Sequence, residues 1–272
     1  MSASDNLIDA VGHAHQPAGS DPRIVCLVPS ITELLCDLGL QRQLVGRTGF
    51  CIHPREVVRA IPKVGGTKDV DIDKVRKLKP THVIVNVDEN RKESVAEIAT
   101  FGPTIVVTHP LAPQDNLHLY RMLGALFARE TDAERWCREY ARVDAQIGLA
   151  ECRPARRVLY LIWRKPWMTV NRDTYISRTL ARFNWQTVPA DAAVRYPEIA
   201  LGTFAGRVDH VLLSTEPYAF QTRHVAEVRE LFAAADVRLL DGEMTSWYGS
   251  RAIAGLRYLD DYTRKASNQV AA

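Results

Sequence analysis

The stretch RIVCLVPSITELLCDLGL, residues 23–40, decides the fold class of this chain. Its first part, 23–30, is a continuous apolar run that ends in Pro-Ser, which is typical of a strand buried in a parallel sheet. Ser30 stands three residues before Glu33, the spacing of a helix capping box, and Gly39 follows the apolar helical pattern. The stretch therefore predicts a buried strand, a turn and a helix.

The same alternation of strand and helix continues along the chain. Further strands are expected at 44–48, 81–87, 103–110 and 156–163, with helices at 71–80 and 91–102. From Asn116 to about Leu149 the periodicity is helical for about thirty residues, with one possible break near Arg129 to Asp132. A helix of this size would be about 45–50 Å long, enough for a rigid connector. This order predicts an α/β protein with two Rossmann-like lobes, mostly parallel sheets and one long joining α-helix.

Five segments follow from this pattern. They are a flexible N-terminal tail (1–21), an N-terminal α/β lobe (22–115), a backbone helix (116–152), a C-terminal α/β lobe (153–266) and a tail (267–272).

Composition excludes several classes of protein. The net charge of +3 is too small and too scattered to indicate a nucleic-acid partner or an anionic membrane, and no apolar run is long enough to span a membrane. The five cysteines form no CxxC pair, which argues against a zinc ribbon or a disulfide framework. The first 22 residues lack a basic segment followed by an apolar one, so we expect a cytoplasmic location.

Four blocks carry a resemblance to a known family: RIVCLVPSITELLCDLGL (23–40), LVGRTGFCIHP (44–54), IPKVGGTKDVDIDKVRKLKPTHVIV (61–85) and TIVVTHP (104–110). In order and spacing the chain resembles the substrate-binding proteins of ferric-siderophore and cobalamin ABC importers over about residues 23–265. The resemblance implies two α/β lobes bridged by a backbone helix, a ligand cleft between the lobes, and binding of a metal chelate rather than catalysis.

Ligands of parallel α/β sheets lie outside the carboxyl ends of the strands. With the resemblance, this rule selects the following ligand-binding candidates: Pro29, Ser30, Phe50, Cys51, His53, Gly66, Thr67, Trp163, Arg164, Trp167, Tyr196, Tyr218, Trp247, Tyr248 and Arg251. The aromatic residues offer flat apolar surfaces for a large conjugated ligand, and the arginines offer cations for its rim. Each aromatic residue could instead pack the core of its lobe.

The stretch GFCIHP (49–54) raises the question of a metal site. His53 could ligate the metal of a bound chelate, line the cleft without ligation, or be purely structural. Cys51 is more typical of a small buried apolar residue than of a ligand, and two residues alone do not make a structural zinc site.

The expected ligand is a small-molecule metal chelate, a corrinoid before a ferric siderophore, with no intrinsic cofactor and a monomeric protein. Importer-coupled family members present an acidic residue on the outer face of each lobe. Glu89 or Glu93 matches that place in the first lobe, but Gly202 and Thr203 stand there in the second, which leaves an ABC permease partner open.

The alternative is a cytosolic chelatase-like or corrinoid-modifying enzyme that uses His53. It needs a second titratable group facing His53, with Glu216, Asp241 and Glu243 as the candidates.

Overall fold

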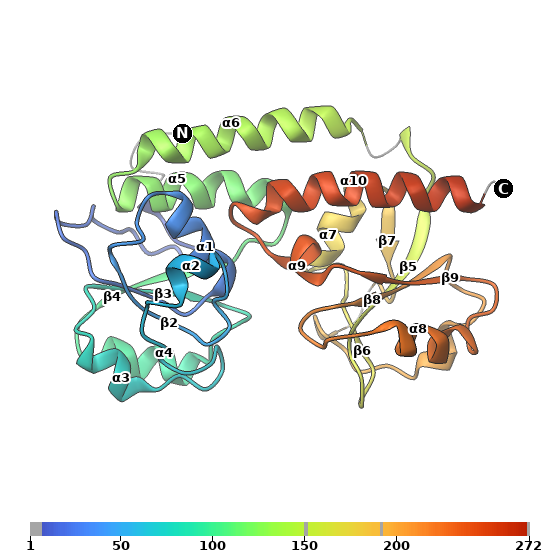
Figure 1. The fold of residues 1–272 in the computed structure, drawn as a ribbon, viewed down its shortest axis with the longest axis horizontal. Coiled ribbons are helices and arrows are strands. Elements are labelled where there is room, and N and C mark those ends of the chain that lie inside the picture. The colour runs from blue at the N-terminus through green and yellow to red at the C-terminus, as the bar shows by residue number, and fades with distance from the viewer. Residues whose placement is uncertain (1–6, 150–151, 191–192, 271–272) are drawn as a thin grey trace. The chain divides into compact units, whose positions relative to one another are not determined.

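The computed structural model describes residues 7–149, 152–190 and 193–270, which form two compact units (Figure 1). The first unit comprises the described residues up to Pro110, Gln114–Tyr140 and Tyr248–Arg251. The second comprises Leu111–Pro113, Ala141–Trp247 and the described residues from Ala252 onward.

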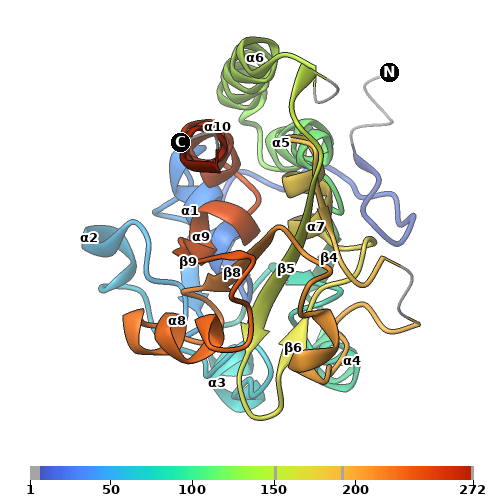
Figure 2. The same cartoon turned by 90° about the vertical axis from the view of Figure 1, so that its right-hand side faces the viewer.

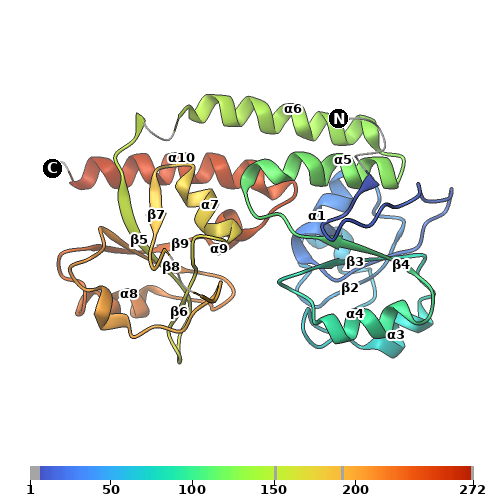
Figure 3. The ribbon, with the colours of Figure 1, turned by 180° about the vertical axis from the view of Figure 1, so that it is seen from behind.

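The first unit is built on a parallel sheet in the order β2-β1-β3-β4. Its strands are β1 (Ile24–Cys26), β2 (Leu44–Arg47), β3 (His82–Asn86) and β4 (Thr104–Thr108). Helices α3 (Ile72–Lys77) and α4 (Lys92–Ala99) cover one face of the sheet, and α1 (Pro29–Asp37) and α5 (Asn116–Leu126) cover the other (Figures 1 and 3). A short helix, α2 (Arg55–Val58), follows β2.

The core of this unit joins the sheet to α3 and α4. Val25 and Val83 of the strands pack with Val75 of α3 and Ile98 of α4, and all four are fully buried. Burial of each such side chain stabilises the folded unit by roughly 1.5–3 kcal/mol. The strands predicted from apolar runs therefore supply much of the core of this unit.

The start of α1 differs from the predicted capping box. The helix begins at Pro29 with Val28 as the N-cap, and no side chain caps it. Proline suits the first helical position because its fixed φ is already helical and its missing N–H has no helical partner. Ser30 therefore lies inside the helix, and Glu33 pairs with Arg251 instead.

The expected loose tail is folded from residue 7 onward. The Ala10 N–H donates to the Val107 carbonyl at 3.0 Å, and the Val107 N–H donates to the Asp9 carboxylate at 3.1 Å. Asp9 also lies 3.1 Å from His15, and both residues are buried. The segment satisfies the backbone groups that an edge strand such as β4 would otherwise expose.

The backbone helix predicted over 116–152 is two helices, separated close to the break that the sequence allowed near Arg129. The chain forms α5 and α6 (Glu130–Ile147), and between them Ala128 adopts a φ of 54°, which ends the first helix. A Cβ at Gly124 would lie 2.5 Å from that of Ala133, so the two helices pack closely, as Figure 1 also shows. The boundary between the two units falls within α6, after Tyr140.

The second unit contains a sheet in the order β6-β5-β8-β9, with β7 added to β5. The strands are β5 (Arg156–Trp163), β6 (Met168–Thr169), β7 (Trp185–Thr187), β8 (His210–Ser214) and β9 (Asp236–Leu240). All pairings are parallel except that of β6, which folds back on the carboxyl end of β5 (Figure 2).

Helix α8 (Thr222–Arg229) covers one face of the second sheet, and α7 (Tyr175–Ala181) and α10 (Arg251–Val270) lie on the other (Figure 3). Helix α9 (Gly242–Ser246) precedes α10, and short 3-10 turns span Pro113–Asp115 and Leu201–Phe204. Two α/β units with parallel sheets confirm the predicted fold class.

The predicted tail 267–272 is helical as far as Val270, and residues 271–272 lie outside the described part of the chain. Within that part, no helix combines the length and apolarity that crossing a membrane requires.

Candidate functional site

Three loops of the first unit meet at the carboxyl edge of its sheet. Gly49 N–H donates to the Gly65 carbonyl at 2.7 Å, which joins the loop after β2 to the loop at 63–70. Asn90 Nδ2 donates to the Thr67 carbonyl at 3.0 Å, which joins that loop to the segment after β3. Gly65 has a φ of 100°, and a Cβ there would overlap the Asp69 carbonyl, so only glycine allows this arrangement.

These loops expose apolar side chains. Phe50 is 60% exposed, and Ile52 and Val87 are each 47% exposed. The Phe50 ring lies over Gly66, where a Cβ would approach it to 3.3 Å. The sequence analysis selected Phe50 as a site residue but not Ile52 or Val87, and Val87 directly follows β3. We call Phe50, Ile52 and Val87 the first apolar surface.

Asn90 holds this surface in place and was not predicted. It is buried, and its Nδ2 lies 3.3 Å from the Leu27 carbonyl as well as 3.0 Å from that of Thr67. Its Oδ1 accepts the Asn86 N–H at 2.8 Å. One amide thus links the ends of β1 and β3 to the loop that carries the predicted residues Gly66 and Thr67.

Three predicted residues lie beneath the surface. Pro29 and Ser30 are buried in the first turn of α1. Cys51 is fully buried, with Thr32 Oγ1 at 3.1 Å and Thr48 Oγ1 at 3.2 Å from its sulfur, and burial raises the pKa of its thiol. All three support the loops and are not exposed on them.

His53 is half-buried in the turn before α2. Among the residues that the structure describes, no group of three or more His, Cys, Asp or Glu side chains could hold a metal ion.

Tyr248 and Arg251 belong to the first unit, and both have internal partners. Tyr248 donates its hydroxyl hydrogen bond to Glu89, and burial, followed by the Glu89 charge, raises its pKa. Arg251 donates to both oxygens of Glu33, at 2.8 and 2.6 Å. Of the two predicted docking residues, Glu89 is half-buried and accepts the Tyr248 hydroxyl, whereas Glu93 is exposed on α4.

An aromatic cluster occupies the carboxyl ends of β5 and β8 in the second unit. Trp163 is 40% exposed and contacts Tyr218 edge-on, with 5.6 Å between ring centroids. Tyr218 lies 4.6 Å from Phe220, which stacks in parallel on Trp167 at 6.0 Å. His224 packs edge-on against Phe220 at 5.6 Å. We call these five residues the aromatic cluster.

The cluster unites three predicted residues, Trp163, Trp167 and Tyr218, with Phe220 and His224. Sequence reasoning did not select His224, although its spacing from Gln221 matches a capping box.

The predicted cation beside this cluster is paired. Arg164 Nη2 lies 2.8 and 2.9 Å from the two carboxylate oxygens of Glu227, and hydrogen bonding to Glu227 raises its pKa. Its guanidinium also lies 5.9 Å from the Trp167 ring. Tyr196 is half-buried elsewhere in the unit under Arg195, at 5.7 Å.

Trp247 is buried and donates its indole N–H to Glu216 at 2.7 Å. Asp241 caps α9 by accepting the Met244 N–H at 3.3 Å. Two of the three acids on which the enzyme alternative depended therefore have structural roles.

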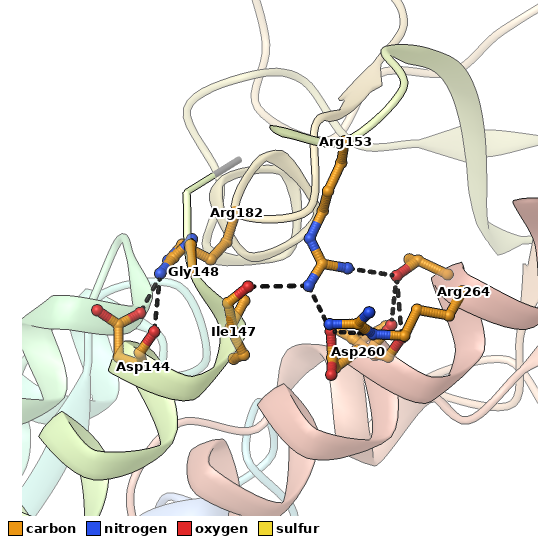
Figure 4. A network of polar contacts seen from close by, with 9 residues as sticks. Asp144, Ile147, Gly148, Arg153, Arg182, Asp260 and Arg264 are labelled. Atoms are coloured by element: carbon orange, nitrogen blue, oxygen red, sulfur yellow. Dashed lines mark hydrogen bonds and ion pairs between the residues drawn. The ribbon is translucent and has the colours of Figure 1, made fainter. Parts of the chain in front are cut away.

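A pocket of about 460 Å³ lies at the opposite, amino-terminal edge of the second sheet. It is lined by Ile147, Gly148, Leu149, Cys152, Arg153, Pro154, Phe183, Trp185, Thr263 and Arg264. Figure 4 shows Arg153 and Arg264 both bound to Asp260, and Arg182 bound to Asp144. Because these arginines are engaged and the pocket lies away from the carboxyl ends of the strands, the aromatic cluster remains the candidate surface of this unit.

With the geometry in place, the chain can be compared with known proteins. Residues 24–151 match the model of a family described as periplasmic binding protein. The predicted resemblance is confirmed there, in the part of the chain where its most specific motifs lie.

Two vitamin B12-binding proteins and a heme-binding protein extend the comparison. The chain is 21% identical over 196 residues to a vitamin B12-binding protein of Vibrio cholerae serotype O1, which covers 71% of this chain and 70% of that protein. The structure of a periplasmic vitamin B12-binding protein of Vibrio cholerae matches with a TM-score of 0.78 and 18% identity, covering 90% of this chain and 98% of that one. The periplasmic heme-binding protein of Roseiflexus sp. RS-1 matches with a TM-score of 0.77 and 21% identity, covering 91% and 99%.

These comparisons bear on two predictions, the cellular location and the choice between binding and catalysis. The cytoplasmic location is wrong, because the matched family is that of periplasmic binding proteins and two of these relatives are periplasmic by name. Amino-terminal composition, on which that prediction rested, did not determine the location. The same proteins are named as binding proteins, which favours binding over the enzyme alternative.

Proposed function

We propose that this protein binds a metal-chelate small molecule, with a corrinoid as the first candidate and heme or a ferric siderophore as the others. The observation that carries the proposal is the presence of exposed apolar groups at the carboxyl edge of the parallel sheet in each unit. These groups are the first apolar surface in one unit and, in the other, Trp163, whose ring packs edge-on against the half-buried Tyr218. The names of the B12- and heme-binding relatives support the same ligand class.

The charges near these surfaces favour a ligand of low net charge. Arg164 Nη2 is paired with Glu227, and Arg251 is paired with Glu33, so each guanidinium already has a carboxylate partner within its own unit. A strongly anionic tricatecholate complex would need such cations at its rim. A corrinoid, whose periphery is rich in amides, needs mainly apolar contact and hydrogen bonds.

His53 is proposed to touch the bound chelate, either at its periphery or at its metal. An ABC permease is the proposed partner, and exposed Glu93 on α4 is the remaining docking candidate of the first unit.

The test is a titration of the purified protein with cyanocobalamin, hemin and an iron(III) tricatecholate, followed by tryptophan fluorescence and isothermal calorimetry. We expect saturable binding with one equivalent of cyanocobalamin or hemin and weaker binding of the tricatecholate. Absence of binding to all three probes would refute the proposal.

His53→Ala separates the two roles of His53. A changed absorbance spectrum of the bound chelate would indicate ligation of its metal, and a changed affinity with an unchanged spectrum would indicate peripheral contact.

A further inference from the structure

His224 connects the aromatic cluster to the first turn of α8. It is the third helical residue, and its Nδ1 accepts the Gln221 N–H at 2.9 Å, while the Gln221 side chain accepts a backbone N–H in return. A neutral imidazole has one accepting nitrogen, and both ring nitrogens of His224 have a donor directed at them: the Gln221 N–H at 2.9 Å from Nδ1 and the Arg223 Nε–H at 3.4 Å from Nε2. The shorter bond makes Nδ1 the acceptor, so neutral His224 carries its proton on Nε2. The helix cap therefore requires the neutral ring.

The same ring supports the cluster from behind. His224 is 4% exposed, and its edge meets Phe220 at 5.6 Å and Tyr218 at 5.7 Å between centroids. Tyr218 in turn contacts Trp163, and Phe220 stacks on Trp167. Displacement of this one ring would disturb both pairs.

The charges around His224 oppose its protonation. Arg223 on α8 places its Nε 3.4 Å from Nε2, and Arg164 reaches the cluster from the turn after β5. Glu227, on the next turn of α8, is the nearby carboxylate, and it is already paired with Arg164; Tyr218 is the remaining titratable neighbour. Burial first, and then Arg223 and Arg164, hold the pKa of His224 below its usual 6.5, against the opposing effect of Glu227.

We infer that His224 is a positioning residue that keeps the aromatic cluster in its binding form only while the imidazole is neutral. Protonation places a hydrogen on Nδ1 opposite the Gln221 N–H, so two donors face each other and the cap opens. The cluster then loses its support, and the affinity for the chelate falls. The effect on affinity rests on the proposed function, whereas the effect on the cluster does not.

The direction with pH follows from the lowered pKa. Above pH 6.5 the ring is neutral in the folded and unfolded states alike, and the cap is intact. As the pH falls below 6.5, the unfolded state takes up the proton before the folded state, so stability is lost. The folded ring itself becomes charged only at lower pH, when the pKa lowered by burial is reached.

His224→Gln is the informative variant, because glutamine at the third helical position accepts the N-cap N–H in a capping box and does not titrate in this range. His224→Ala removes both the cap and the ring contacts. The tautomer in the wild type is read from long-range ¹H–¹⁵N correlations of the histidine rings, and the His224 signals are those missing in the glutamine variant.

In the absence of ligand, we expect the Nε2–H tautomer at pH 7.5 and a change of tryptophan emission between pH 7.5 and 5 in the wild type only. With cyanocobalamin, the wild type should lose affinity as the pH falls over this range, and His224→Gln should lose less than twofold. An Nδ1–H tautomer, or an equal emission change in His224→Gln, would overturn the inference. If cyanocobalamin does not bind but the tautomer and the emission change are as expected, the proposed ligand is wrong. The inference that protonation of His224 disturbs the aromatic cluster is then supported on its own.

Discussion

The hydroxyl of Tyr248 donates a hydrogen bond to the carboxylate of Glu89, across 159 residues of sequence. The bond forms inside the first unit, although Tyr248 lies between α9 and the main part of α10, which belong to the second. Next to it, the Gly249 N–H donates to Asn116 at 2.6 Å, and Tyr120 donates to the Gly249 carbonyl at 2.8 Å. The short segment Tyr248–Arg251 is therefore part of the first unit's structure.

Loss of the Tyr248 hydroxyl should destabilise this unit. Tyr248→Phe leaves the ring in place but removes a hydrogen bond to a charged acceptor, which is worth about 1.5–3 kcal/mol. Guanidinium unfolding followed by circular dichroism measures the change. Glu89→Gln, which keeps an acceptor oxygen, should lose less. Equal stability of Tyr248→Phe and the wild type would show that the bond contributes nothing.

The Arg251–Glu33 pair should matter more than the exposed ion pairs. Both side chains are mostly buried and joined by two hydrogen bonds, so Arg251→Ala leaves a poorly solvated carboxylate and should cost about 2–4 kcal/mol in the free energy of unfolding. The matched control is Arg76→Ala, whose pair with Asp73 is exposed and should be worth less than about 1 kcal/mol. Similar losses in the two variants would contradict this prediction.

Truncation of the exposed apolar groups should reduce binding without reducing stability. Phe50→Ala and Trp163→Ala each remove a ring from a candidate surface, and we expect about a tenfold loss of cyanocobalamin affinity from each, close to 1.4 kcal/mol. Leu231→Ala is the control, because Leu231 is similarly exposed but lies after α8, away from both surfaces. Calorimetry gives the affinities. An equal loss in all three variants would indicate a nonspecific effect.

The cysteines should differ sharply in reactivity. Burial raises the pKa of Cys36 to about 12 and that of Cys137 to about 11, and it also raises the pKa of Cys26 and Cys51. Cys152 is exposed. At pH 8 the folded protein should therefore show one fast thiol with Ellman's reagent, which Cys152→Ser removes, and all five should react in denaturant. Fast labelling of Cys51 would contradict its buried position.

Local patterns predicted the strands well. The apolar runs at 23–30, 81–87 and 156–163 contain β1, β3 and β5, because short runs rich in β-branched residues are typical of strands buried in a sheet. The same patterns allowed a break near Arg129 but did not show that the chain reverses at Ala128. Helical periodicity is alike for one helix or two, and only the packing of Gly124 on Ala133 selects the reversal.

The candidate surfaces were predicted in part. Phe50, Trp163, Trp167 and Tyr218 were identified because they follow strands. Their supports, Asn90 and His224, were missed, because a buried polar residue is recognised only by partners that the fold brings to it.

The sequence by itself thus determined the order of elements, the α/β class and the loops at the carboxyl ends of the strands, all of which depend on the periodicity of neighbouring residues. Only the tertiary structure decided which side chains are exposed there and which are engaged. No local pattern in the sequence indicated partners for Tyr248 and Arg251, yet in the folded chain they hydrogen-bond to Glu89 and Glu33. Such pairings are set by the packing of distant segments, because a charged or polar group must find its partner when it leaves water, wherever in the chain that partner lies.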